Sequence, residues 1–159
     1  WDQGNYSEAS SPDSGLGLAR MIGMMTYQTE ESMERKFGHL RRNNHWEIEN
    51  YLNYQGRKLA ERFDANCYLR LIDAMDSHDL TSRFDYQERV SRKTGRVLLV
   101  GDNSDLLYGI EHQKKLAEKW AGWGASIGWQ DLGTQNGNDS FLIDFPILEE
   151  KIAQFLKES

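Results

Sequence analysis

Residues 97–105 read Val-Leu-Leu-Val-Gly-Asp-Asn-Ser-Asp, and this stretch decides the fold class of the chain. Val97 to Gly101 is a continuous apolar run, which is typical of a parallel strand covered on both faces. Downstream, Ile110 to Trp120 has a helical pattern, Ala125 to Leu132 is a second strand-sized segment, and Asp144 to Leu156 is a terminal helix. The order strand, helix, strand, helix predicts the closing units of an α/β fold.

The chain before this α/β region has a different apolar period. Apolar residues there recur every three or four positions, which predicts amphipathic helices. The predicted helices are Leu16–Tyr27, a segment from the N-cap Thr29 to Phe37, Glu47–Phe63 and Ala65–Met75. Consecutive helices with no strand between them indicate a helical cap. We therefore expect a loop at 1–15, a helical lid or cap at 16–83, and the C-terminal portion of an α/β core at 84–159.

Two parallel strands do not make a stable sheet by themselves. They leave long unpaired edges, which proteins normally cover or pair. We therefore expect the rest of the sheet to be supplied by another segment, on the same precursor or on a separate chain.

Composition narrows the class of protein. The chain has 159 residues and a formal net charge of −6, and this acidic balance argues against a nucleic-acid partner. No apolar run approaches the roughly 20 residues of a membrane span, and no charged-then-apolar leader is visible. The single cysteine is compatible with a reducing compartment, so we expect a cytoplasmic protein with no membrane partner. The histidines show no metal-binding spacing, so no metal is expected.

Polar motifs follow both predicted strands. Ser104-Asp105 follows the first strand, and Gly137-Asn138-Asp139 follows the second. In α/β-hydrolases, the catalytic Asp follows one strand and the catalytic His follows the next. Asp105 is therefore the candidate acid, and Asn138 stands where the base is expected. A carboxamide cannot take a proton from a serine hydroxyl near neutral pH.

Each of these motifs also has a purely structural interpretation. Asp105 is a residue type that caps turns through its side chain. The sequence Asn136-Gly137-Asn138 is ordinary turn chemistry, because Asn and Gly tolerate positive φ. Both interpretations stay open at this level.

A nucleophile is missing from the chain. Gly124-Ala125-Ser126-Ile127-Gly128 satisfies the G-x-S-x-G pattern. A nucleophile elbow, however, needs a strand before the serine and a helix after it. Here a helix is predicted before the serine and a strand after it, so Ser126 is not expected to be the nucleophile.

Several motifs together resemble the C-terminal half of the homoserine O-acetyltransferase family, including its fungal relatives that acetylate secondary-metabolite alcohols. The additional motifs are Leu18-Ala19-Arg20-Met21-Ile22-Gly23, Tyr27, Glu49-Asn50-Tyr51-Leu52, Tyr54-Gln55-Gly56, Arg62-Phe63-Asp64-Ala65-Asn66 and Ala74-Met75-Asp76. They occur in the family order and cover nearly the whole chain. The resemblance implies the C-terminal part of an α/β-hydrolase fold, with the nucleophile-bearing half elsewhere.

The resemblance also implies roles for particular residues. Asp105 would be the catalytic acid and Asn138 would occupy the position of the catalytic His. Arg20 would contact the carboxylate of an amino-acid substrate, Asp139 would pair with its amine, and Tyr27 would line the same pocket. Acetyl-CoA would be the co-substrate, with no bound cofactor, and the expected partners are a small-molecule alcohol and further copies of the chain. Without the resemblance, a structural ion pair on a helix is the more common role for Arg20.

Two functions remain open from the sequence. The chain is either a segment of a homoserine O-acetyltransferase-like enzyme, active in methionine biosynthesis or a related pathway, or a catalytically dead relative acting as a binding or partner subunit. The retained Arg20, Tyr27 and Asp139 favour the first, and Asn138 favours the second.

Overall fold

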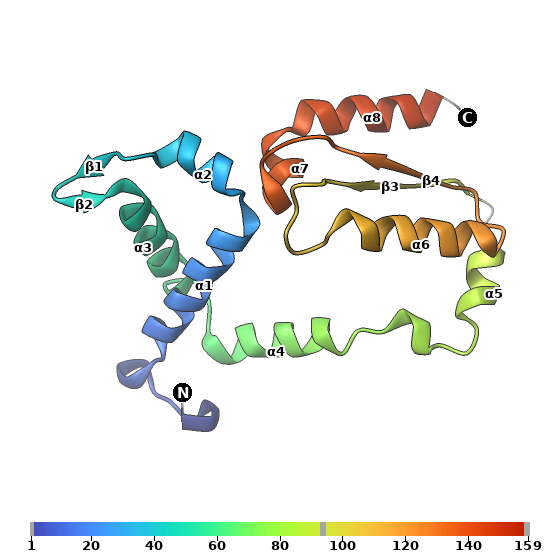
Figure 1. The fold of residues 1–159 in the computed structure, drawn as a ribbon. Helices are drawn as coiled ribbons and strands as arrows, with labels where there is room; N and C mark the ends of the chain where they lie inside the picture. Colours follow the sequence, from blue (N-terminus) through green and yellow to red (C-terminus); the bar gives the residue numbers. More distant parts are fainter. Residues whose placement is uncertain (1, 93–94, 158–159) are drawn as a thin grey trace. The chain divides into compact units, whose positions relative to one another are not determined.

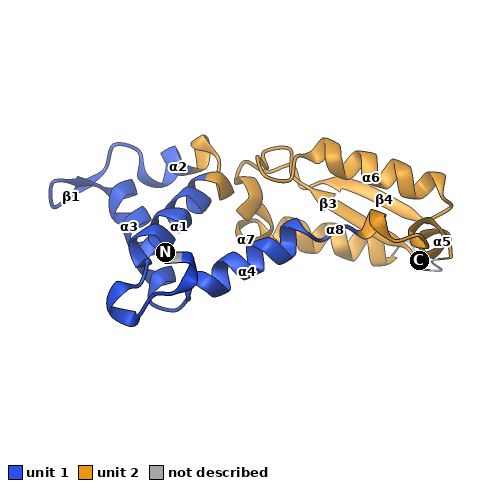
Figure 2. Cartoon of the chain, turned by 90° about the horizontal axis from the view of Figure 1, so that it is seen from below, with its two compact units in different colours: residues 1–25, 33–79 blue, residues 26–32, 80–159 orange. Residues whose placement is uncertain are grey.

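A computed structural model describes residues 2–92 and 95–157, and it divides this part of the chain into two compact units (Figures 1 and 2). Unit 1 comprises residues 1–25 and 33–79, and unit 2 comprises residues 26–32 and 80–159. Trp1, residues 93–94 and residues 158–159, which fall within the predicted regions 1–15 and 84–159, lie outside the described residues.

Unit 1 is helical. Its main elements are α1 (Asp13–Tyr27), α2 (Glu30–Phe37), α3 (Glu47–Ala60) and α4 (Ala65–Asp76), with the first two contributing residues to both units. The glycines of α1 and α3 bring these helices into backbone contact. A Cβ placed on Gly56 would lie 2.9 Å from the carbonyl oxygen of Gly17. Gly56, singled out above in Tyr54-Gln55-Gly56, is thus required by helix packing.

Two features of unit 1 differ from the sequence-based expectation. The first is the predicted loop at 1–15, which contains the short 3₁₀-helices η1 (Asp2–Gly4) and η2 (Glu8–Ser10) and the start of α1. Tyr6 holds this segment in place, because its hydroxyl donates to Asp64 at 2.5 Å and accepts from the Asn66 amide at 3.1 Å. Tyr6 lies far from Asp64 and Asn66 along the chain, so the local sequence pattern gives no indication of these hydrogen bonds.

The second difference is a small hairpin between the helices, where no strand was expected. Strands β1 (Arg41–Arg42) and β2 (His45–Trp46) pair antiparallel. Asn43 and Asn44 form the turn with φ values of 51° and 64°. Positive φ at both central residues is the geometry that hairpin turns require, and Asn accepts it.

Unit 2 confirms the predicted strand, helix, strand, helix order. Strand β3 (Val97–Gly101) pairs parallel with β4 (Ile127–Asp131), in register from Val97 with Ile127 to Gly101 with Asp131. Helices α6 (Ile110–Gly122) and α8 (Phe145–Lys157) lie on opposite sides of the strand pair (Figure 1). The loops after β3 and β4 therefore emerge at the same edge.

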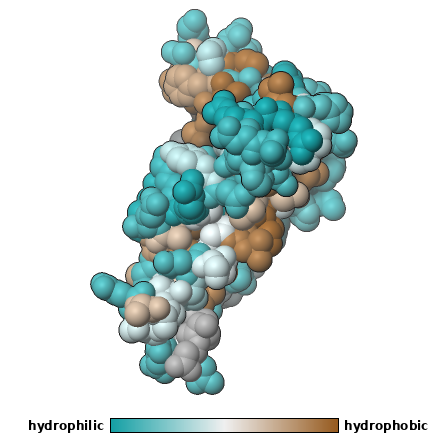
Figure 3. Space-filling model, turned by 90° about the vertical axis from the view of Figure 1, so that its left-hand side faces the viewer, coloured by the Kyte–Doolittle hydropathy of each residue, from teal (hydrophilic) through white to brown (hydrophobic). Residues whose placement is uncertain are grey.

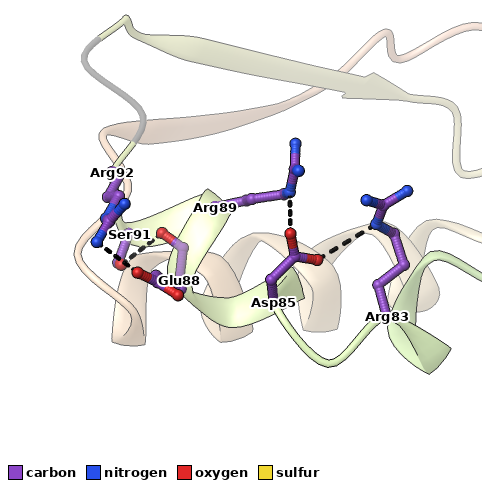
Figure 4. A network of polar contacts seen from close by, with 6 residues as sticks. All are labelled: Arg83, Asp85, Glu88, Arg89, Ser91 and Arg92. Atoms are coloured by element: carbon purple, nitrogen blue, oxygen red, sulfur yellow. Dashed lines mark hydrogen bonds and ion pairs between the residues drawn. The ribbon is translucent and has the colours of Figure 1, made fainter.

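Short elements complete unit 2. They are η3 (Leu80–Ser82), α5 (Tyr86–Ser91), η4 (Gly137–Asp139) and α7 (Ser140–Ile143). Helix α5, which was not predicted, is stabilised by side-chain contacts shown in Figure 4: Asp85 pairs with Arg83 and Arg89, and Glu88 pairs with Arg92. The pairs Asp85–Arg89 and Glu88–Arg92 are four residues apart, which is the spacing for pairing along one face of a helix.

The units do not coincide with the expected division at residue 83, because residues 26–32 group with the α/β part. The Thr29 hydroxyl donates to the carbonyl oxygen of Gln135 at 2.5 Å. Gln28, Thr29 and Ser32 are all buried. The connection between α1 and α2 is thus packed against the loop that follows β4.

The apolar core is thin. Its members, 5–9% exposed, are Leu16, Met24, Leu52, Leu59, Val90, Ile110, Ala117, Ala125 and Leu132. The only described side chain below 2% exposure is that of Ser140, at 1%. The deepest point of the described structure is therefore polar, and it lies where the loops after the two strands meet.

Candidate acid-and-base site

The structure brings Asp105 and Asn138 together, as the spacing of their motifs predicted. Asp105 follows β3, and Asn138 lies in η4 after β4. The side-chain nitrogen Nδ2 of Asn138 donates to Oδ2 of Asp105 at 3.1 Å. Because an ionised carboxylate only accepts hydrogen bonds, the NH₂ group of the amide must face Asp105.

The structure confirms the turn-capping interpretation of Asp105 and also places its carboxylate against Asn138, while its role as a catalytic acid stays a prediction. Its Oδ1 atom accepts from the backbone amides of Leu107 at 2.8 Å and Tyr108 at 3.0 Å, which is turn capping. Its Oδ2 atom faces Asn138. The cap fixes the carboxylate and leaves the second oxygen directed at its partner, which is the geometry that a triad acid needs to orient an imidazole.

The turn interpretation of Asn136-Gly137-Asn138 also holds. Gly137 has φ of +71°, and a Cβ there would lie 2.9 Å from the carbonyl oxygen of Tyr27. The Nδ2 atom of buried Asn136 donates to Asp144 at 2.7 Å. The turn is thus both a tight structural element and the support of Asn138.

A cavity of about 360 Å³ opens beside the pair. Asp105 and Asn138 line it together with apolar side chains. Leu132 and Phe141 are among the latter. The pair therefore borders a partly apolar space rather than lying sealed inside the loops.

The expected substrate residues are divided between the units. Asp139 and Tyr27 belong to unit 2, and both are half-buried. The carboxylate of Asp139 accepts from Nε2 of buried Gln28 at 3.3 Å. Arg20 lies on α1 in unit 1 and is half-buried, so its pairing with a substrate carboxylate stays a prediction.

A second carboxylate at this edge escaped the sequence reasoning. Asp102 is only 5% exposed and accepts from the amides of Ser104 and Thr134 at 2.8 and 3.0 Å and from the Ser104 hydroxyl, and its Oδ2 atom lies 2.8 Å from the Thr134 hydroxyl oxygen. Burial alone would raise the pKa of Asp102, but these hydrogen bonds outweigh it and hold the pKa below its usual range. The only signal in the sequence is its place directly after the strand.

The G-x-S-x-G match is not a nucleophile elbow. Ser126 lies between α6 and β4, so it has a helix before it and a strand after it, as predicted. Among the described residues, no group of three or more His, Cys, Asp or Glu could hold a metal ion. No helix in the described ranges is long and apolar enough to cross a membrane.

Comparison with known proteins identifies relatives over the whole chain. The chain is 42% identical to homoserine O-acetyltransferase from Symbiobacterium thermophilum, over 98% of this chain and 43% of the relative. It is 41% identical to the enzyme of that name from Chloroherpeton thalassium, over 99% of this chain and 41% of the relative. The chain thus spans less than half the length of the curated relatives it matches. No protein-family model matches it.

Solved structures agree on the fold. Homoserine O-acetyltransferase from Bacillus anthracis superposes with a TM-score of 0.80 at 23% identity, over 98% of this chain and 44% of that chain. Esterase E22 superposes with a TM-score of 0.80 at 18% identity, over 98% of this chain and 45% of that chain. The chain therefore corresponds to the C-terminal part of a homoserine O-acetyltransferase-like protein of the α/β-hydrolase fold.

Proposed function

We propose that the chain forms part of a homoserine O-acetyltransferase-like enzyme, in which it supplies the acid Asp105 and the base position Asn138. The reaction would move an acetyl group from acetyl-CoA to the hydroxyl of an amino acid or metabolite, in the cytoplasm. The observation that carries the proposal is the contact of 3.1 Å between Asn138 and Asp105 at the carboxyl edge of the parallel strands.

The chemistry requires a serine from another part of the fold. Its oxygen would attack the thioester carbonyl, and the C–S bond would break to release CoA as its thiol. The substrate hydroxyl would then attack the acyl-serine, forming the product ester and regenerating the serine. A base must accept one proton in each step and return it to the leaving sulfur or oxygen. The amide of Asn138 cannot carry that proton.

The proposed partner is the nucleophile-bearing half of the fold, and the exposed apolar surface supports it. In unit 2, large apolar residues at least 40% exposed include Phe84, Leu106, Tyr108, Phe141, Leu142, Phe145 and Leu156. Figure 3 shows apolar residues at the surface among hydrophilic ones. Large apolar side chains exposed in this number are expected to be covered by a partner. A homo-oligomer is proposed in addition, from the resemblance.

A second candidate function is a binding or partner subunit without turnover. The observation that favours it is the amide of Asn138 itself, because Asp105 already satisfies its donor. Such a subunit would keep Arg20, Tyr27 and Asp139 for recognition of a small-molecule alcohol. If the chain is part of an enzyme, an imidazole at position 138 should be enough to complete the site. If it is a binding subunit, the site should stay inactive even with that imidazole.

The test is complementation in two pieces. The chain is produced together with the part of the Symbiobacterium relative that precedes the matched region, and acetyl transfer from acetyl-CoA to homoserine is followed by thiol release and product mass. The wild-type complex should be nearly inactive. Asn138→His should raise turnover on the order of a thousand-fold or more, because loss of a triad base costs about a million-fold in a serine hydrolase.

Two controls make the result decisive. Asp105→Asn added to Asn138→His should abolish most of the gain, since the imidazole would lose its orienting acid. Brisk transfer by the wild-type complex would mean that another group supplies the base. A complex that assembles but gains nothing from Asn138→His would favour the binding subunit.

A further inference from the structure

The most buried carboxylate at the edge of the strands belongs neither to the Asp105–Asn138 pair nor to the expected substrate residues. We propose that Asp102 is a positioning residue, which clamps the loops after β3 and β4 together and so sets the contact between Asp105 and Asn138. A catalytic role for the contact between Asp105 and Asn138 rests on the proposed function. The positioning by Asp102 can be tested without measuring enzyme activity.

Each oxygen of Asp102 holds a different loop. Its Oδ1 atom accepts from the backbone amide of Ser104 at 2.8 Å and from the Ser104 hydroxyl, both in the loop after β3. Its Oδ2 atom accepts from the backbone amide of Thr134 at 3.0 Å and lies 2.8 Å from the Thr134 hydroxyl, in the loop after β4. A single ionised group therefore bridges the loops with charge-assisted hydrogen bonds, which are stronger than neutral ones.

The bridge closes into a ring at Gly137. The Ser104 hydroxyl oxygen accepts from the Gly137 amide at 3.0 Å. On the other side, Thr134 Oγ1 lies 2.6 Å from Ser140 Oγ, and the Ser140 hydroxyl donates to the Gly137 carbonyl oxygen at 2.6 Å. We call Asp102, Ser104, Thr134, Gly137 and Ser140 the Asp102 ring. The other members of this ring thus form hydrogen bonds with both the amide N–H and the carbonyl oxygen of Gly137.

The ring acts directly on the pair. Asp105 is bonded covalently to Ser104, and Asn138 is bonded covalently to Gly137, so each member of the pair is one peptide from a ring member. Ser140 is only 1% exposed, so its hydroxyl must find its hydrogen-bond partners within the protein. Buried polar networks rigidify a structure when every member is satisfied, and loosen it when one partner is removed.

Another carboxylate at the same edge provides a matched comparison. Asp131 also links the loops, because its Oδ1 atom accepts from the amides of Asn103 at 3.3 Å and Gly133 at 2.9 Å. It is more exposed than Asp102, and the two amides that it accepts from belong to residues outside the ring. Replacing Asp131 with Asn removes the same charge from the same edge and removes no hydrogen bond between members of the ring.

The test reads the Asn138 side-chain amide by NMR in the isotopically labelled 159-residue chain, bound to the unlabelled nucleophile-bearing piece of the complementation test. The Asp105→Asn variant serves as the reference, because it shows where the Asn138 amide signal lies when the carboxylate of Asp105 is absent. Asp102→Asn and Thr134→Val should each move the Asn138 amide signal most of the way toward that position. Thr134→Val matters because it opens the ring without changing charge. Asp131→Asn and the conservative Thr134→Ser should leave the signal near its wild-type position.

Folding is checked for every variant by circular dichroism. If Asp102→Asn does not fold, Thr134→Val and Ser140→Ala report on the same ring with smaller changes. A wild-type amide signal in folded Asp102→Asn or Thr134→Val chain would overturn the proposal. An equal displacement in Asp131→Asn would also overturn it, because loss of charge alone would then explain the effect. Inactivity of the two-piece complex would not alter this readout, so failure of the two proposals can be told apart.

Discussion

The amide of Asn138 donates to Oδ2 of Asp105 at 3.1 Å across 33 positions of sequence, so the candidate acid is matched to a group that cannot act as its base. The amide offers an N–H toward Asp105, as an imidazole at that position would. The contact therefore keeps an N–H donor against the carboxylate but offers no group that can take a proton. The contact between Asn138 and Asp105 therefore supports the proposed function, and its contribution to stability can be tested by substitution.

Replacing Asn138 with Asp should destabilise the chain more than replacing it with Ala. Asn138→Ala removes a hydrogen bond to a carboxylate, which costs about 1.5–3 kcal/mol in free energy of unfolding. Asn138→Asp also places a second carboxylate against Asp105, and like charges at this distance repel. Urea unfolding at pH 7 should show the larger loss for Asp. Equal stability of the two variants at pH 7 would contradict the observed contact.

Asp102 should contribute to stability in a pH-dependent way. Its pKa is lowered in the folded chain, so its stabilising contribution is present above the ordinary carboxyl range and is lost as pH falls through the folded-state value. The difference in free energy of unfolding between wild type and Asp102→Asn should therefore shrink as pH falls from 7 to about 3. Denaturant titrations at several pH values measure it. A difference independent of pH would show that the carboxylate charge is not what the ring uses.

Gly137→Ala should be more harmful than Gly133→Ala. Both glycines have positive φ, +71° and +73°, so each substitution carries a backbone cost of about 1–2 kcal/mol. Only at Gly137 would the added Cβ also meet another atom, 2.9 Å from the carbonyl oxygen of Tyr27, whereas nothing lies within 4 Å at Gly133. The midpoint of thermal unfolding is measured for both variants. The loss at Gly133 gives the backbone strain alone, and the additional loss at Gly137 gives the cost of the steric clash. A larger loss at Gly133 would mean that residues 26–32 do not pack on the turn.

Gly56→Ala should destabilise unit 1, while Gly15→Ala should not. The Cβ added at Gly56 would lie 2.9 Å from the Gly17 carbonyl oxygen, and overpacking of this kind costs about 1–3 kcal/mol. At Gly15, which is also helical, nothing lies within 4 Å, so alanine should be neutral or stabilising by up to about 1 kcal/mol. Helical circular dichroism against temperature is the measurement. Tolerance of Ala at both positions would contradict the close helix contact.

Local pattern was sufficient for the elements that are regular along the chain. The apolar run from Val97 to Gly101 predicted the strand to its observed bounds, and the helical period after Ile110 predicted α6. It failed at the hairpin, where Asn43 and Asn44 are turn residues between two strands of two residues each. Such short strands have no alternation to detect.

The sequence by itself determined the strand order, the juxtaposition of Asp105 with Asn138, and the absence of an imidazole at that position. It could do so because parallel strands end at one edge, so residues that follow them meet there whatever the packing around them. Only the tertiary structure decided which other residues complete the site. Asp102, Thr134 and Ser140 are ordinary loop residues in the sequence, and they become a ring because burial removes water and obliges each polar group to find a partner within the fold.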